Sequence, residues 1–280
     1  MMGVMESVDD ERMAVDWGYC EINGPHSWVS KFPDAAGERQ SPIDISPVSV
    51  TKFHTEERLQ WKYEPESSTK LENTGAAWKV GVKGKGSELK GGPLDDEYVL
   101  DQFHCHWGET NDKGSEHTIN GEPFAGELHM VHWNSAKYAD INEAASNPDG
   151  LSVLGVFLKP GKKNDELEKV VKYLDQITHK GDVVEIPESI DPKLLIPKDT
   201  GGYYTYHGSL TTPPCSECVI WVVFKEPIEV SDEQLNAFRQ IRKYNKNDEI
   251  CCDANCDGYV KKNFRPTVPI GEREVKECRQ

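Results

Sequence analysis

The fold is decided by the stretch Gln102-Phe103-His104-Cys105-His106-Trp107-Gly108, together with Glu127-Leu128-His129-Met130-Val131 about two dozen residues later. Each stretch alternates polar and apolar residues, and successive side chains of a β-strand point to opposite faces. The pattern therefore predicts two strands, with His104 and His106 on one face of the first. If the strands are neighbours, about 5 Å apart, His129 meets that pair.

Three imidazoles on a rigid sheet favour a zinc site. Neutral nitrogen ligands suit zinc, and three protein ligands leave a fourth position for water, as in catalytic sites. Cys105 lies between two of the histidines in the chain, but it points to the opposite face of the strand and is a poor candidate ligand. The expected chemistry is hydrolysis or hydration.

Two further polar residues strengthen the zinc interpretation. Gln102 precedes His104 by two residues, and Glu127 precedes His129 by two, so each lies on the face of its histidine. They are candidate acceptors that would fix the imidazole tautomers. The alternative is a set of surface or core histidines on a polar sheet.

Four more motifs carry a family resemblance. The chain resembles the α-class carbonic anhydrases from about Trp17 to Pro266, in the order and at the spacing of that family. The motifs are Trp17-Gly18-Tyr19, Gly37-Glu38-Arg39-Gln40-Ser41-Pro42-Ile43-Asp44-Ile45, Gly114-Ser115-Glu116-His117-Thr118 and Ser209-Leu210-Thr211-Thr212-Pro213-Pro214.

The resemblance implies reversible hydration of carbon dioxide to bicarbonate and a proton by a zinc-bound hydroxide. Carbonic anhydrases are themselves the usual example of zinc lowering the pKa of its bound water to about 7. By resemblance, the Thr211 hydroxyl orients the hydroxide and donates to Glu116. The family's apolar wall for carbon dioxide corresponds to Val131, Val153, Leu210 and Trp221, and Thr212 would contact bicarbonate.

One position departs from the family. Fast members carry a histidine that relays the proton away from the metal, because an imidazole with a pKa near neutral both accepts and releases protons. Aligning Asn73-Thr74-Gly75-Ala76-Ala77-Trp78-Lys79-Val80 on the family pattern puts Ala76 at that position. We therefore expect proton release to be slower, unless another histidine such as His26 replaces the relay.

The composition limits the possible partners. Hydrophobic residues make up 36% of the chain, and no apolar run approaches the roughly 20 residues that span a bilayer. The 32 basic and 48 acidic residues give a formal charge of −16, which repels nucleic acid and anionic membranes. We expect a small-molecule substrate, carbon dioxide or bicarbonate, and a monomer.

The N-terminus and the cysteines bear on localisation. Residues 1–15 are acidic and lack the basic and apolar regions of a signal peptide. We expect them to form a flexible tail before a single catalytic domain over residues 16–280. Secreted relatives usually pair a cysteine before the Gln-Ser-Pro motif with one after Pro-Pro. At the corresponding positions this chain has Cys215 after Pro-Pro but Ala35-Ala36 before the Gln-Ser-Pro motif. We therefore expect eight free thiols and a cytoplasmic protein.

A cysteine-rich segment could suggest a second metal. Cys251, Cys252 and Cys256 lack the paired spacing of a structural zinc site, and no histidine is near them. We interpret the segment as a surface insertion.

The rest of the pattern predicts a mixed, β-dominated single domain. Strand-length runs rich in β-branched and aromatic residues are Trp61-Lys62-Tyr63, Leu71 to Val82, Tyr98-Val99-Leu100, Leu151 to Leu158 and Val219 to Phe224. Helices are expected at Asp165 to Gln176 and at Ser231 to Arg242, the second with a capping box of Ser231 and Gln234. The resemblance adds a large, twisted, mostly antiparallel central sheet of about ten strands with peripheral helices.

Two other functions compete with carbon dioxide hydration. The fold has non-catalytic members that lost zinc ligands and serve as binding modules, but His104, His106, His129, Glu116 and Thr211 are all present here. A zinc esterase would need an acyl pocket or oxyanion hole, of which the sequence shows no sign. Inhibition by a primary sulfonamide together with fast hydration separates the first function from both others.

Overall fold

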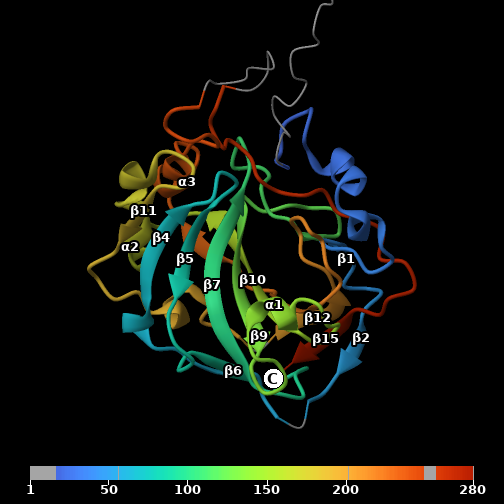
Figure 1. Cartoon of the computed structure of the whole chain (residues 1–280). Coiled ribbons are helices and arrows are strands. Elements are labelled where there is room, and N and C mark those ends of the chain that lie inside the picture. Colours follow the sequence, from blue (N-terminus) through green and yellow to red (C-terminus); the bar gives the residue numbers. More distant parts are fainter. Residues whose placement is uncertain (1–16, 56, 201, 249–256, 280) are drawn as a thin grey trace, which may run out of the picture.

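One large sheet crosses the molecule, and its central strands are β7 (Tyr98–Trp107) and β9 (Gly126–Asn134) (Figure 1). The computed structural model describes residues 17–55, 57–200, 202–248 and 257–279. The predicted N-terminal tail and the segment with Cys251, Cys252 and Cys256 lie outside these residues.

Ten of the thirteen strands of this sheet form a single path with β7 and β9 inside it. In spatial order the path is β11 (Val183–Glu185), β4 (Ser68–Asn73), β5 (Trp78–Val82), β7, β9, β10 (Leu151–Pro160), β13 (Val219–Phe224), β12 (Gly202–Gly208), β15 (Lys276–Arg279) and β2 (Thr51–Phe53). Off the path, β14 (Ile228–Val230) pairs with β10, and β6 (Glu88–Lys90) pairs with β7 and with β3 (Gln60–Lys62). Strands β1 (Asp44–Ile45) and β8 (Thr118–Ile119) make a separate pair.

The predicted β-dominated fold is confirmed, with a mixed sheet. Most pairings are antiparallel, but β10 runs parallel to β13 and β14, and β15 runs parallel to β2. The expected run from Leu71 to Val82 is two strands, because Gly75 takes a left-handed φ of 85° and the Thr74 N–H donates to the Ala77 carbonyl, which closes a turn between β4 and β5.

The two faces of the central strands bury different material. Phe103, Cys105 and Trp107 of β7 join Leu128 and Met130 of β9 in the larger hydrophobic core. Helices α2 (Asp165–Val171) and α3 (Asp232–Phe238) pack on this face, since Leu167 and Phe238 belong to the same core. The opposite face carries a second core, which includes Val131 and Trp221.

Both predicted helices exist but are shorter than expected. Asn164 caps α2 by accepting from the backbone N–H groups of Glu166 and Leu167, and the helix ends before Tyr173, whose φ of −108° and ψ of 1° leave the α-helical region. The rest of that prediction is a separate 3-10 turn, η4 (Leu174–Ile177).

The capping box of Ser231 and Gln234 on α3 is confirmed. This helix ends at Phe238, because the following backbone bonds to other segments: the Arg242 N–H donates to the Thr178 carbonyl, and Ile241 accepts from Val260. The remaining helical pieces are short: α1 (Ile141–Ala144), η1 (Pro25–Ser30), η2 (Pro33–Ala36), η3 (Pro65–Ser67) and η5 (Pro192–Leu195). Within the described residues, no helix has the length and apolar character needed to cross a membrane.

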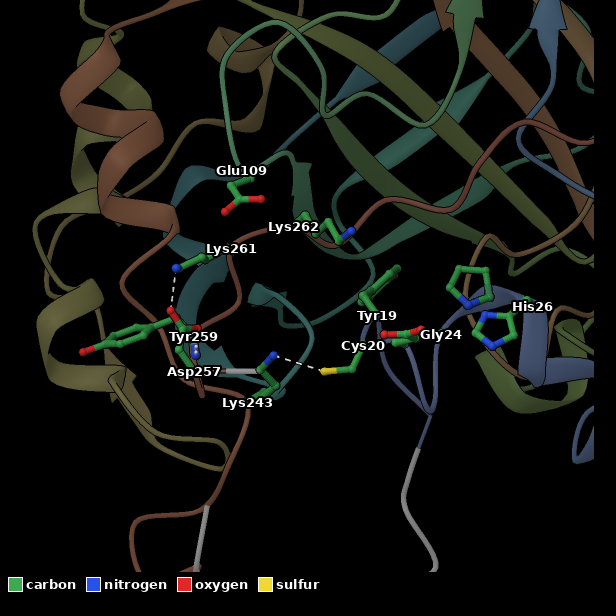
Figure 2. A pocket seen from close by; sticks show the side chains of 12 residues that line it. Tyr19, Cys20, Gly24, His26, Glu109, Lys243, Asp257, Tyr259, Lys261 and Lys262 are labelled. Carbon is green, nitrogen blue, oxygen red and sulfur yellow. Dashed lines mark hydrogen bonds and ion pairs between the residues drawn. The ribbon is translucent and has the colours of Figure 1, made fainter. Parts of the chain in front are cut away.

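A cavity of about 490 Å³ lies between the segment 19–26 and the C-terminal residues Lys243, Asp257, Tyr259, Lys261 and Lys262 (Figure 2). Its lining mixes opposite charges: Lys261 pairs with Asp257 at 2.5 Å, and Lys243 Nζ donates to Cys20 Sγ at 3.3 Å. None of the predicted metal ligands, orienting residues or wall residues lines this cavity, whereas His26, the alternative relay, does.

Candidate metal centre

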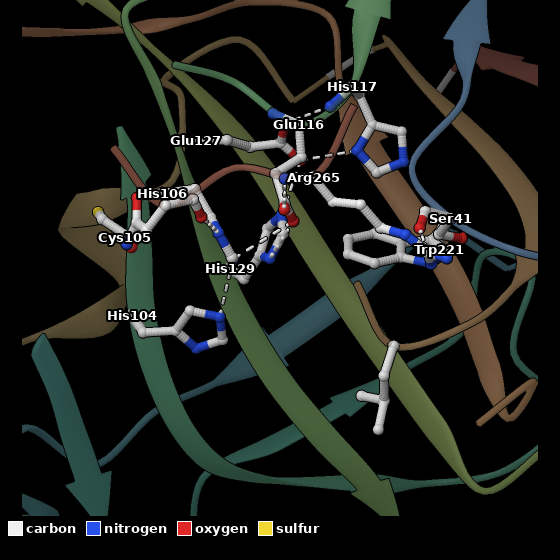
Figure 3. Close-up of polar contacts among 12 residues, drawn as sticks. Ser41, His104, Cys105, His106, Glu116, His117, Glu127, His129, Trp221 and Arg265 are labelled. Carbon is white, nitrogen blue, oxygen red and sulfur yellow. Dashed lines mark hydrogen bonds and ion pairs between the residues drawn. The ribbon is translucent and has the colours of Figure 1, made fainter. Parts of the chain in front are cut away.

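The three histidines converge on one face of the sheet (Figure 3). His104 and His129 are direct partners across β7 and β9, and His106 follows on the same face. The ring centroids of His106 and His129 lie 4.6 Å apart, and His104 Nε2 lies 3.2 Å from His106 Nε2. One nitrogen from each ring falls within 4.8 Å of the others, a spacing that could hold a metal ion.

A fixed acceptor holds the other nitrogen of each ring. His104 Nδ1 donates to Gln102 Oε1 at 2.8 Å, and His129 Nε2 donates to Glu127 Oε1 at 2.7 Å. His106 Nδ1 donates to the backbone carbonyl of Asn263 at 2.7 Å. These hydrogen bonds set the tautomers, so the lone pairs of His104 Nε2, His106 Nε2 and His129 Nδ1 remain for a ligand.

Asn263 is the acceptor that sequence reasoning missed. Its side chain also ties the neighbouring backbone together: Oδ1 accepts from the Trp107 N–H, and Nδ2 donates to the carbonyls of Cys105 and Ala76. Its carbonyl reaches His106 from 157 positions away in the chain. No periodicity within the strands could indicate such a contact.

Cys105 points away from the three imidazoles and is buried among the apolar side chains of the opposite face (Figure 3). Burial raises the pKa of its thiol well above the usual value, so the group stays protonated and is a poor metal ligand.

The imidazoles themselves are held neutral. Burial lowers the pKa of His129, and burial with the neighbouring imidazoles lowers that of His104 well below its usual value. The same causes, partly opposed by the Asn263 carbonyl, lower the pKa of His106 to about 3. Neutral imidazole is the form that binds metals.

Glu127 anchors a buried network beside the three histidines. Its Oε2 accepts from the backbone N–H groups of Glu116 and His117, and its Oε1 also accepts from His117 Nδ1 at 2.7 Å. His117 Nε2 lies 2.6 Å from the Tyr206 hydroxyl. His117, Glu127 and His129 also form a group close enough for a metal, but these hydrogen bonds already occupy the carboxylate oxygens.

Glu116 lies against the metal-facing side of the imidazoles. Its Oε1 accepts from the Arg265 N–H at 2.8 Å, and its Oε2 is buried without a hydrogen-bond partner, 3.3 Å from His106 Nε2. Burial and the Glu127 charge raise the pKa of Glu116 well above its usual value, whereas the Arg265 N–H and the Thr211 hydroxyl lower it. Thr211 is therefore within reach of this carboxyl group.

The predicted apolar wall follows the sheet register next to the imidazoles. Val153 of β10 pairs directly with Val131 of β9 and with Trp221 of β13. Val131 follows His129 by two residues and so lies on the same face of β9. Leu210 packs against the same cluster, and the Trp221 indole donates to the Ser209 carbonyl at 3.1 Å. Thr212 is half-buried in this loop, and its carbonyl accepts from Cys215.

Ala76 lies in the turn between β4 and β5 and is half-buried. Its carbonyl accepts from Asn263 Nδ2 at 2.9 Å, and Asn263 is bonded in turn to His106. The turn is thus connected to the histidine cluster, and the side chain of Ala76 has no titratable group.

These residues define a class of site: three neutral imidazoles beside a buried carboxyl group, at a spacing that could hold one metal ion. Residues 23–279 match the family model of the eukaryotic-type carbonic anhydrases. The chain belongs to that family and is a carbonate dehydratase, a lyase that acts on carbon dioxide and bicarbonate.

Proposed function

We propose that this chain catalyses the zinc-dependent, reversible hydration of carbon dioxide, with the ion held by His104, His106 and His129. One observation carries the proposal. The Nδ1 protons of His104 and His106 are committed to Gln102 and Asn263, so their Nε2 lone pairs face each other at 3.2 Å. Two facing lone pairs repel unless a cation lies between them.

The donor set fits zinc. Three imidazole nitrogens leave a position open for water, as they do in carbonic anhydrases themselves. When bound, zinc would supply a nucleophile at neutral pH by lowering the pKa of a water to about 7, the value for which this family is the usual example.

Thr211 and Glu116 would orient that nucleophile. The buried Glu116 Oε2 without a partner is the natural acceptor for the Thr211 hydroxyl. A hydroxyl that donates to this carboxylate keeps its lone pairs for the proton of the attacking group, which fixes the direction of attack. The Arg265 N–H holds the other carboxylate oxygen in place.

Carbon dioxide would bind against Val131, Val153, Leu210 and Trp221. The substrate is apolar, so a dry surface beside the nucleophile binds it by contact and excludes competing water. Val131, Val153 and Trp221 are each no more than 5% exposed. Thr212 would contact bicarbonate with its hydroxyl.

Proton release would limit the maximal rate, because Ala76 cannot relay a proton. Lys79, in the same segment, is an unsuitable substitute, since it lacks the imidazole that both accepts and releases protons near neutral pH. Imidazole buffer should therefore raise the maximal rate saturably, and Ala76→His should raise it several-fold without imidazole. A maximal rate indifferent to both changes would place the relay elsewhere.

A cytoplasmic monomer with reduced thiols remains part of the proposal. Cys215 is a free thiol in the structure, as are Cys105, Cys218 and Cys278. Burial raises the pKa of Cys215 to about 11, which disfavours its oxidation. Alkylation of the protein unfolded without reductant, followed by mass analysis, tests the expected count of eight thiols.

A simple primary sulfonamide should inhibit the enzyme and bind only the metal-loaded form. A non-catalytic binding module would show neither zinc nor turnover. A dedicated esterase would hydrolyse esters faster than it hydrates carbon dioxide.

A further inference from the structure

The row of residues that contains the metal ligands continues beyond them across the sheet. His129 pairs directly with His104, His104 with Lys79 of β5, and Lys79 with Glu72 of β4. Directly opposed residues of neighbouring strands point to the same face, with Cβ atoms about 5 Å apart. Lys79 therefore lies beside His104 on the metal-facing side.

The Lys79 ammonium is only loosely engaged. Its Nζ lies 3.5 Å from Glu72 Oε2, and the two side chains are 36% and 29% exposed. Ion pairs of this exposure contribute little to stability, so an anion can compete with Glu72 for the ammonium. The flexible lysine stem can also carry its charge several ångströms toward the metal site.

The charge of Lys79 already acts on its surroundings. It opposes the rise in the pKa of Asp101 that burial causes. The chain as a whole carries a formal charge of −16, which repels bicarbonate. A local cation beside the reaction centre opposes that repulsion over about 8 Å at physiological salt.

We propose that Lys79 is an anion-positioning residue, whose ammonium exchanges Glu72 for bicarbonate and holds this anion beside the three imidazoles. The inference rests on the proposed function, since bicarbonate must bind there. A lysine ammonium is a compact point charge with three donors, which suits a small monovalent anion. Carbon dioxide carries no charge, so the ammonium gives it no comparable attraction.

Binding is the appropriate measurement. The overall equilibrium ties kcat/KM for carbon dioxide to kcat/KM for bicarbonate, so a variant cannot change one without the other. The probe is thiocyanate, a monovalent anion, titrated into cobalt-substituted protein and followed by the visible spectrum of the metal. The KM for bicarbonate of the zinc enzyme is the second readout.

Lys79→Gln should weaken thiocyanate binding and raise the KM for bicarbonate by about three- to tenfold, the size expected of one partly screened charge. Glu72→Gln should change both in the opposite direction, because it releases the ammonium from its competitor. Both differences should shrink as ionic strength rises.

Lys83→Gln is the matched control. Lys83 directly follows the end of β5, four residues after Lys79, and its Nζ lies 3.8 Å from Glu185 Oε1. The Lys83→Gln variant loses the same charge as Lys79→Gln but should leave the Kd of thiocyanate unchanged.

The outcomes separate the two claims. Equal affinities in the wild-type protein and Lys79→Gln, with one metal ion per chain in each, would overturn the role of Lys79 and leave the proposed function standing. Equal losses in Lys79→Gln and Lys83→Gln would also overturn it, since net charge alone would then be responsible. A wild-type protein without zinc would overturn the proposed function, and this inference with it.

Discussion

The two faces of strands β7 and β9 have the same backbone but opposite chemistry. One face presents Phe103, Cys105 and Trp107 to the larger core, and the other presents Gln102, His104 and His106 to the candidate metal centre. Alternation along a single strand therefore builds a stabilising surface and a reactive surface together. The apolar face gives the reactive face its rigidity, because a packed core fixes the backbone from which the imidazoles project.

The neighbouring positions Cys105 and His106 show the difference most clearly. Both are buried, with exposures of 0% and 1%. Burial keeps the cysteine protonated among apolar side chains, whereas the same burial keeps the imidazole neutral and ready to bind a metal. What a buried group can do depends on the face that it occupies.

The largest expected effect comes from removing one imidazole. His129→Ala takes away a third of the ligand set and should abolish stoichiometric zinc binding and turnover, as measured by metal analysis and carbon dioxide hydration. Cys105→Ser, on the other face, should keep one zinc per chain. If Cys105→Ser were the variant that lost zinc, the division between the faces would be wrong.

Thr211→Ala tests orientation without changing the ligands. We expect zinc content to be unchanged and kcat to fall on the order of 10²-fold, the usual cost of one preorganised hydrogen bond. Thr211→Ser, which keeps the hydroxyl, should recover most of the rate. Full activity in the alanine variant would assign the orienting role to another group.

Gln102→Ala and Met130→Ala should affect two different quantities, zinc affinity and stability. The first removes the acceptor for His104 Nδ1 and should weaken zinc affinity about 10- to 100-fold. The second creates a cavity in the larger core and should cost about 2–5 kcal/mol of unfolding free energy. Competition with a chelator and denaturant titration of the metal-free proteins measure the two quantities. Similar changes in both variants would show that the faces are not separable.

A charge cluster outside both faces should have the smallest effect. Hydrogen bonds from Lys137 and Tyr138 hold the pKa of Asp149 below its usual value, and Lys137 does the same for Asp96. A carboxyl group whose pKa is lower in the folded state stabilises the folded protein at pH values above its unfolded pKa of about 3.9. This stabilisation is lost as the pH falls through the folded pKa.

Asp149→Asn should therefore lower Tm slightly at pH 7, and the difference from the wild-type protein should shrink toward pH 3. Both proteins are compared without metal, so that loss of zinc in acid plays no part. A Tm difference that stayed constant with pH would mean that the ionised carboxylate is not the cause.

The sequence predicted the local part of the site well. Alternation placed the three imidazoles on one face, and the two-residue offset placed Gln102 and Glu127 beside their histidines. Contacts from distant loops could not be predicted in this way. The Asn263 carbonyl and the Arg265 N–H are backbone groups that every loop offers, and only the folded path of residues 263–265 brings them to His106 and Glu116.

The helix ends were also beyond sequence reasoning. Helical spacing in the apolar residues continued past Val171, but the backbone turned at Tyr173 and placed Leu174 and Ile177 in the core through a 3-10 turn. Local propensity cannot indicate where tertiary packing ends a helix.

Stopped-flow hydration of carbon dioxide, with zinc determined on the same sample, tests the central claim most directly. We predict one zinc per wild-type chain, turnover that disappears when a chelator removes the metal and returns when zinc is added, and His129→Ala lacking both zinc and activity. Hydration that persisted in metal-free protein, or zinc retained in full by His129→Ala, would contradict the assignment of the reaction to these three imidazoles.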